Sequence, residues 1–237
     1  MTGDRVLIIV PAHNEADALP SVLAELRAYA SEYDVVVVND GSTDATADVA
    51  RDAGFRVLDM CFNLGIGGAV QAGFKYAVER GYDVAVQMDG DGQHLAAEIE
   101  LLLAPVRAGE CDLCIGSRFL TDTEYDGSGW RRWGTRYLST ICSLVTGRRI
   151  TDATSGFRAY GTRALRYLSS YYPSDYPEPE TIVLLSRRGM AMREVPVRMR
   201  PRQAGKSSIS GASTVYYIAK VSLSVFLAVF KEGRQAA

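Results

Sequence analysis

The order of the apolar runs along this chain constrains its fold more than any other feature of the sequence. Five short runs rich in β-branched residues alternate with four segments of helical period. The runs are Val6–Val10, Val35–Val38, Arg56–Met60, Val84–Met88 and Leu113–Gly116. The helical segments between them are Leu19–Ala30, Thr43–Ala53, Gly67–Arg80 and Ala96–Ala108. Strict alternation of this kind predicts an α/β fold with a mainly parallel central sheet and helices on both faces.

The composition is that of an ordinary globular protein. The chain has 237 residues, of which 47% are hydrophobic and 23% charged, which is enough for one main domain. A formal net charge of −2 gives no reason to expect nucleic acid as a partner. The first residues lack the apolar core and cleavage site of a signal peptide, so we expect a cytoplasmic protein.

The four cysteines do not predict a metal site or disulfides. Cys111 and Cys114 have the spacing of a CxxC motif, but no second CxxC follows, and Cys114 lies in a predicted strand. We therefore expect buried, reduced thiols.

Polar or glycine-rich loops follow every predicted strand. They read PAHNE, NDGSTD, NLGIGG, DGDGQH and SRF. Each loop alone is ordinary turn chemistry. In parallel α/β sheets, however, ligands bind beyond the carboxyl ends of the strands, so five such loops at one edge predict a site there.

The fourth of these loops carries two carboxylates, Asp89 and Asp91, separated by single glycines. Together with Gln93 they offer hard oxygen ligands, which favour Mg²⁺ or Mn²⁺ over zinc. The spacing also resembles a calcium-binding loop ending at Glu100. His94 stands where that loop needs glycine, and a strand precedes the motif instead of a helix, so we set calcium aside.

Two nucleotide-binding motifs fail on specific positions. NLGIGGAVQAG resembles the dinucleotide fingerprint GxGxxG, but Val70 occupies the third glycine position counted from Gly65. The triplet Gly205–Ser207 has the last residues of a Walker motif without its beginning.

Taken in series, the motifs resemble those of family-two glycosyltransferases of the GT-A fold. The motifs are PAHNE, VVNDGSTDAT, NLGIGGAVQAGFKYA, QMDGDGQH, GSRF, DATSGFRAY and RQAGKSS. Within that family the sequence is most similar to the dolichol-phosphate mannosyltransferase-like branch, which includes polyprenyl-phosphate glucosyltransferases. The resemblance covers nearly the whole chain. It implies a nucleotide-diphospho-sugar transferase that inverts configuration at the sugar.

The resemblance also implies which residues bind the nucleotide. They are Pro11, Ala12, Asn14, Glu15, Asp40, Gly68 and Asp89. An alternative for Asn14 is helix capping. For Gly68 and its neighbouring glycines, close packing of the third helix on the sheet is the alternative explanation.

By the same resemblance, Asp89, Asp91 and Gln93 form the metal site. Asp91 and Gln93 are expected as direct ligands and Asp91 as a catalytic residue, while Asp89 faces sugar, ribose or metal. The metal would stabilise charge on the departing nucleoside diphosphate.

The acceptor decides which further residues are needed. A hydroxyl acceptor needs a general base, for which the resemblance suggests Asp152. A lipid phosphate is already anionic and instead needs cationic side chains. We assign Arg118, with Asp152, to catalysis. The residues assigned to phosphate or acceptor binding are Arg131, Arg158, Glu180, Arg202 and Lys206. Glu178 and Glu180 have a second explanation, since acidic residues favour the first turn of a helix.

We expect a catalytic domain over residues 1–211, with a nucleotide-binding half (1–118) and an acceptor half (119–211) that contains an edge strand in MREVPVRM. Residues 212–237 form an apolar tail, too short to span a bilayer, which is expected either to lie on the membrane surface or to dock on the core or another subunit.

The leading hypothesis is transfer of a hexose from a GDP- or UDP-linked sugar to a polyprenyl phosphate at the cytosolic membrane face, by peripheral contact or with a membrane-protein partner. The alternatives are transfer to a saccharide hydroxyl and a non-catalytic nucleotide-sugar-binding module. Donor base, sugar and oligomeric state stay open.

Overall fold

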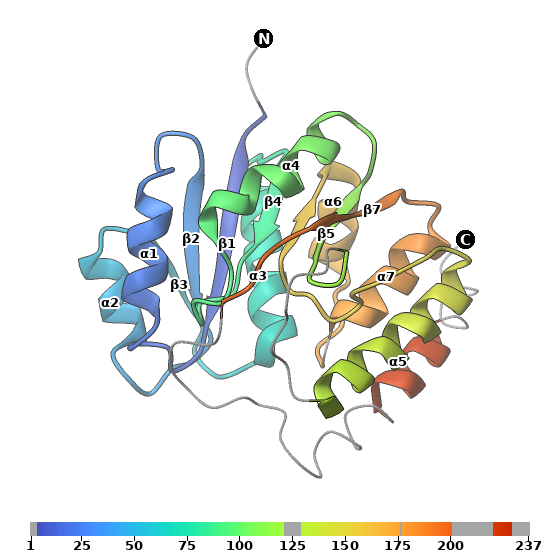
Figure 1. Ribbon diagram of the computed structural model, residues 1–237. Helices are drawn as coiled ribbons and strands as arrows, with labels where there is room; N and C mark the ends of the chain where they lie inside the picture. Colours follow the sequence, from blue (N-terminus) through green and yellow to red (C-terminus); the bar gives the residue numbers. More distant parts are fainter. Residues whose placement is uncertain (1–3, 121–128, 176, 201–219, 229–237) are drawn as a thin grey trace.

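The computed structural model describes residues 4–120, 129–175, 177–200 and 220–228, with no side-chain description for 129–132. Its centre is a seven-stranded sheet in the order β3-β2-β1-β4-β6-β5-β7 (Figure 1). The strands are β1 Val6–Ala12, β2 Asp34–Asn39, β3 Arg56–Asp59, β4 Val84–Gln87, β5 Leu113–Ser117, β6 Arg158–Tyr160 and β7 Met192–Pro196. The helices are α1 Leu19–Arg27, α2 Thr46–Asp52, α3 Gly65–Glu79, the 3₁₀ helix η1 Ala96–Glu98, α4 Ile99–Arg107, α5 Gly129–Thr146, α6 Thr162–Ser170 and α7 Pro177–Arg187.

The sheet is mainly parallel, as predicted. Strand β1 pairs in parallel with β2 and β4, β2 with β3, and β5 with β7. Strand β6 is antiparallel to both of its neighbours, β4 and β5. It therefore lies between the two strands that carry the acidic turn and Arg118.

Helices cover both faces of the sheet and enclose two separate cores. On one face, Leu7 and Ile9 of β1 share a core with residues of α3, α5, α6 and α7. On the other face, Val6 and Ile8 share a core with residues of α1, α2 and α4. The period of two along a strand explains the division, because neighbouring side chains point to opposite faces. Since both faces are buried, β1 is apolar throughout instead of alternating with polar residues.

The expected elements are present, with small shifts at their ends. Each of the five predicted strands is found, and the predicted edge strand is β7, the last strand of the sheet. The fourth predicted helix is divided into η1 and α4, since a tight 3₁₀ turn commonly begins a helix. Strand β6 was not predicted: it has three residues, one of them the buried Arg158, and so gives no hydrophobic pattern.

The C-terminal tail contains a helix at residues 220–228, shown in red beside α5 in Figure 1. Val221, Val225 and Ala228 pack into the same core as Leu138 and Cys142 of α5. No helix in the described part of the chain has the length and apolar character needed to cross a bilayer.

Candidate active site

The candidate site lies where the strand order reverses. From β1 the chain builds β2 and β3 on one side and then crosses to β4 on the other. A crevice forms at such a point, at the carboxyl ends of the strands. The turn after β4 lies directly against the end of β1, because the Gly90 amide donates to the Pro11 carbonyl at 3.3 Å. A Cβ on Gly90 would lie 3.2 Å from the same oxygen, so glycine suits this approach.

The acidic turn brings its two carboxylates to this crevice. Asp91 is buried, and its Oδ1 accepts a hydrogen bond from the Gln93 amide at 3.0 Å. Gly92 has φ of +77°, a conformation that side chains disfavour and that reverses the chain between these two residues. The Asp89 side chain is one-third exposed, and its Oδ2 lies 3.4 Å from Nε2 of His94.

This donor set fits a magnesium or manganese ion that is completed by a ligand. Among the described residues there is no cluster of three or more histidine, cysteine, aspartate or glutamate side chains that could hold a metal. The turn instead offers two carboxylates and the amide oxygen of Gln93. Mg²⁺ is commonly bound by one or two carboxylates together with substrate phosphates, and Asp89 and Asp91 match that pattern.

No role for His94 could be predicted from the sequence. Its ring is buried and stacks on Phe157 with the ring centres 4.8 Å apart. Within the described residues its Nδ1 is a buried atom with no hydrogen-bond partner. Since a carboxylate only accepts hydrogen bonds, Nε2 must carry the proton if His94 bonds to Asp89.

On the nucleotide side, Asp40 and Asn14 brace neighbouring loops. Asp40 is buried and its Oδ1 accepts from the Leu64 amide at 2.7 Å, which connects the end of β2 to the start of α3. Asn14 has φ of 55°, and its Oδ1 accepts from the Thr43 amide at 2.8 Å. The helix capping considered for Asn14 is not observed, because the N-cap of α1 is Ala18 without a side-chain cap bond, and Asn14 instead joins two loops.

The other predicted nucleotide residues lie along the same edge. Pro11 and Ala12 are the last residues of β1, and the Glu15 amide donates to Thr46 Oγ1 at 2.9 Å. Gly68 lies in the first turns of α3. The adjacent Gly67 does pack closely, but against the segment before α7 and not against the sheet, since a Cβ there would lie 2.1 Å from the Pro173 carbonyl oxygen.

Arg118 and Asp152 form one buried unit on the acceptor side. Arg118 Nε and Nη2 donate to the two Asp152 oxygens at 2.6 and 2.7 Å, and Nη2 also donates to Thr154 Oγ1 at 2.8 Å. The Asp152 side chain is fully buried and that of Arg118 is 12% exposed. Asp152 could act as a general base only if this bidentate pair were broken.

Glu194 of β7 holds the Asp152 loop by hydrogen bonds to its backbone. Its carboxylate accepts from the backbone amides of Thr151, at 2.8 Å, and Asp152, at 2.9 Å. Burial raises the pKa of Glu194, and these amide hydrogen bonds oppose that shift. No sequence signal predicted this role, because Glu194 looks like an ordinary polar residue of an edge strand.

Arg158 has a structural role, which corrects its assignment to the acceptor. The side chain is fully buried in β6, and its guanidinium donates to the carbonyls of Ser155, Glu178 and Ala153 at 2.7, 2.9 and 3.0 Å. It therefore joins the Asp152 loop to the start of α7 and does not face solvent. We do not propose it as an acceptor ligand.

The first turn of α7 carries two acids in different settings. Glu180 is buried within the helix. Glu178 is partly buried, and burial raises its pKa to about 7, with Arg158 opposing the shift and the charge of Asp89 adding to it. Glu178 thus lies within electrostatic reach of the acidic turn.

Three predicted cationic residues cannot be placed. Arg131 belongs to α5, but its side chain is outside the described residues. Arg202 and Lys206 are outside them entirely.

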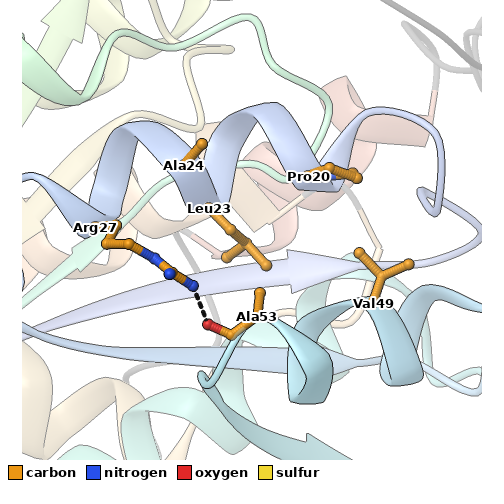
Figure 2. Close-up of a pocket in the computed structure, with 6 residues that line it drawn as sticks. All are labelled: Pro20, Leu23, Ala24, Arg27, Val49 and Ala53. Carbon is orange, nitrogen blue, oxygen red and sulfur yellow. Dashed lines mark hydrogen bonds between the residues drawn. The ribbon is translucent and has the colours of Figure 1, made fainter.

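A pocket between α1 and α2 lies apart from all of these residues (Figure 2). It is lined by Pro20, Leu23, Ala24, Arg27, Val49 and Ala53, and within this lining Arg27 donates to the Ala53 carbonyl. It is mainly apolar and contains none of the predicted site residues.

Comparisons with known proteins show a family match over more than half of the chain. Residues 7–168 match the family model described as glycosyl transferase family 2. The chain is 38% identical over 221 residues to an undecaprenyl-phosphate mannosyltransferase of Micrococcus luteus, covering 87% of this chain and 88% of that protein. It is 32% identical over 219 residues to a polyprenol monophosphomannose synthase of Mycolicibacterium smegmatis, covering 88% of this chain and 82% of that protein.

A solved structure gives the corresponding match in three dimensions. It is glucosyl-3-phosphoglycerate synthase from Mycobacterium tuberculosis in complex with Mn²⁺, uridine-diphosphate-glucose and phosphoglyceric acid. The TM-score is 0.73 at 19% identity, covering 96% of this chain and 80% of that one. At this identity the match concerns the fold, and it confirms the expected GT-A fold.

Proposed function

The chain belongs to glycosyl transferase family 2, and on that basis we propose that it transfers mannose or glucose from a nucleotide sugar to a polyprenyl phosphate. It is a glycosyltransferase, and its named relatives act on lipid phosphates. We further propose that the reaction inverts the sugar configuration and requires Mg²⁺ or Mn²⁺. The proposed place of action is the cytosolic face of the membrane.

The Arg118–Asp152 pair is the observation that carries the choice of acceptor. The Asp152 side chain is fully buried and both of its oxygens accept hydrogen bonds from the Arg118 guanidinium, so the carboxylate is not exposed to an acceptor hydroxyl as a general base would have to be. A phosphate acceptor needs no strong base, because its oxygen is already anionic. What it needs is a cation in a defined position, and the bidentate pair orients Arg118 at the end of β5.

In this proposal the role of each group of residues follows from its position along the sheet edge. Residues 11–15 and Asp40 hold the nucleoside at the ends of β1 and β2, while Asp89, Asp91 and Gln93 hold the diphosphate end. The same three residues would hold a divalent cation, which when bound would supply Lewis-acid stabilisation of the leaving diphosphate. Arg118, with Arg131, Arg202 and Lys206, orients the acceptor phosphate for attack opposite the leaving group.

Glu178 is the one observation that favours the runner-up, transfer to a saccharide hydroxyl. A carboxyl with a pKa of about 7 and within electrostatic reach of Asp89 has the proton affinity of a general base at neutral pH. If the acceptor were a hydroxyl, we would assign the base to Glu178 in preference to Asp152.

The deciding experiment offers both acceptor classes to the purified protein. Labelled GDP-mannose and UDP-glucose are incubated with Mn²⁺ or Mg²⁺ and either undecaprenyl phosphate or a saccharide acceptor, with EDTA as the metal control. We expect labelled lipid, dependent on metal. Labelled saccharide without labelled lipid would replace this proposal with the runner-up, and donor binding without either product would leave a binding module.

A further inference from the structure

Residues Val197–Arg200 connect the two halves of the candidate site, and we call them the strap. At its beginning, the Val197 amide donates to the Ser117 carbonyl at the end of β5, at 3.0 Å. At its end, the Arg200 amide donates to the Gln93 carbonyl at 2.9 Å. The strap therefore runs from the strand that carries Arg118 to the acidic turn.

Gln93 is both an acceptor and a donor toward Arg200 of the strap. The Gln93 Nε2 lies 3.4 Å from the Arg200 carbonyl, and His94 and Met199 form an antiparallel bridge next to it. Because the amide nitrogen of Gln93 faces that carbonyl, its Oε1 points away from the strap. This oxygen is the atom of Gln93 that a cation would use.

A buried carboxylate holds the middle of the strap. Glu98, the last residue of η1, is 5% exposed, and its two oxygens accept from the backbone amide and from Nε of Arg198, both at 2.8 Å. The Arg198 side chain is 71% exposed, so Glu98 is the buried partner of this ion pair. Burying an acid is costly unless its hydrogen bonds are made, and here one partner is the main chain of the strap itself.

We propose that Glu98 is a positioning residue for the metal-binding turn, acting through the strap on Gln93. This inference rests on the proposed function. Glu98 does not touch the ligands itself. By holding Arg198 it keeps Met199 and Arg200 in register with His94 and Gln93, and so fixes the direction of the Gln93 amide.

The test measures binding of UDP and GDP by calorimetry, with and without Mn²⁺, for Glu98→Ala and Glu98→Gln. Loss of a residue that orients a metal ligand typically costs about 10- to 100-fold, so we expect Glu98→Ala to weaken Mn²⁺-dependent nucleotide binding by that factor. Binding of uridine or guanosine alone should not change. The KM for the nucleotide sugar should rise more than kcat falls.

Glu100→Ala is the matched control. It removes the same charge two residues away, from a side chain that is 57% exposed and pairs with Arg107 instead of the strap. Exposed pairs contribute little, so we expect a change in binding of less than about two-fold. Arg198→Met is a milder variant that removes the Nε bond and leaves the backbone bond, in case Glu98→Ala does not fold.

A double-mutant cycle separates positioning from general stability. If Glu98 acts through Gln93, Glu98→Ala should change Mn²⁺-dependent binding by less than about two-fold in a Gln93→Ala background. Equal losses in both backgrounds, or unchanged binding in folded Glu98 variants, would overturn this inference alone. A wild-type protein that binds neither diphosphate with Mn²⁺ would overturn the proposed function and this inference with it.

Discussion

The ion pair between Asp152 and Arg118 changes the role that would be expected for either residue alone. Considered separately in the sequence, one suggested a base and the other a phosphate ligand. In the structure Arg118 donates two hydrogen bonds shorter than 2.8 Å to the buried Asp152 carboxylate, so each charge is paired with the other. A substitution at either residue therefore tests both.

For Asp152→Asn we expect a loss of stability and a moderate loss of turnover. Removing one partner of a buried ion pair typically costs about 3 kcal/mol or more, and the released Arg118 would hold the acceptor phosphate less well. Loss of a true general base would lower kcat by about 10²- to 10⁴-fold and remove an ionisation from the pH profile. Denaturant unfolding and pH-rate profiles with lipid phosphate distinguish these outcomes. Asp48→Asn, which breaks the exposed pair with Arg51, is the control and should leave both nearly unchanged.

Glu178 predicts a pH dependence of stability. Its pKa in the folded protein is about 7, above the ordinary value of 4.5, so the folded state holds the proton more tightly than the unfolded chain. Its contribution to stability is therefore fully present below pH 4.5 and is lost as the pH rises through 7.

Glu178→Gln removes this loss, because glutamine does not ionise. We expect the variant to melt at a higher temperature than the wild type at pH 8 and at a similar temperature at pH 4.5. Thermal unfolding at the two pH values measures the difference. The exposed Glu79→Gln on α3 makes the same chemical change and should show no such pH dependence. Equal behaviour of the two variants would argue against a raised pKa at position 178.

At the scale of elements, α3 joins the nucleotide side to the acceptor side. It begins at the loop held by Asp40, and its Gly67 packs against the main chain of Pro173 and Ser174, just before α7. A Cβ at Gly67 would lie 2.1 and 2.5 Å from those two carbonyl oxygens, so the backbone itself would have to move.

Gly67→Ala should therefore destabilise the protein, although alanine is the better helix former. Overpacking of this kind costs about 1–3 kcal/mol, which exceeds the gain of about 1 kcal/mol expected from helix propensity. Urea unfolding measures the change, with the exposed Lys75→Ala on the same helix as control. A Gly67→Ala variant as stable as the wild type would mean that α3 does not pack this closely on the segment before α7.

At the scale of the whole molecule, the C-terminal helix presents two apolar faces. Val221, Val225 and Ala228 are buried in the core that α3 and α5 share, whereas Leu223, Phe226 and Leu227 are 58%, 58% and 45% exposed. One side of this helix therefore docks on the core, and contact with a membrane stays a prediction for the opposite, exposed side.

Two substitutions separate the faces. Val225→Asp buries an unpaired charge and should lower the unfolding free energy by about 3 kcal/mol or more. Leu223→Asp should leave stability nearly unchanged and weaken binding to phosphatidylglycerol vesicles by about ten-fold or more, given the free energy of burying one leucine side chain. Vesicle co-sedimentation and thermal unfolding of both variants give the result. Wild-type protein that does not bind vesicles would leave the exposed face for a protein partner.

The fold was predictable because its signals are local in the sequence. The apolar runs and the turn residues after them are contiguous, so five strands, four helical segments and the edge carrying PAHNE and DGDGQH could be found from pattern alone. Strand β6 could not be found, because three residues around a buried arginine carry no periodicity. The roles of Arg158, Glu98 and Glu194 were hidden for a related reason: each depends on a partner that is distant in the chain or on backbone atoms.

The sequence by itself determined the order of elements, the edge of the sheet where we propose the site, and the residue types there that suit a nucleoside diphosphate and a divalent cation. The tertiary structure alone decided how those residues are paired. It joined Arg118 to Asp152 across 34 positions and Glu98 to Arg198 across 100, and it buried Arg158 beneath the site. The physical reason is that pattern and propensity act between neighbours in the chain, whereas desolvation and hydrogen bonding of charged groups depend on what the folded chain places around them.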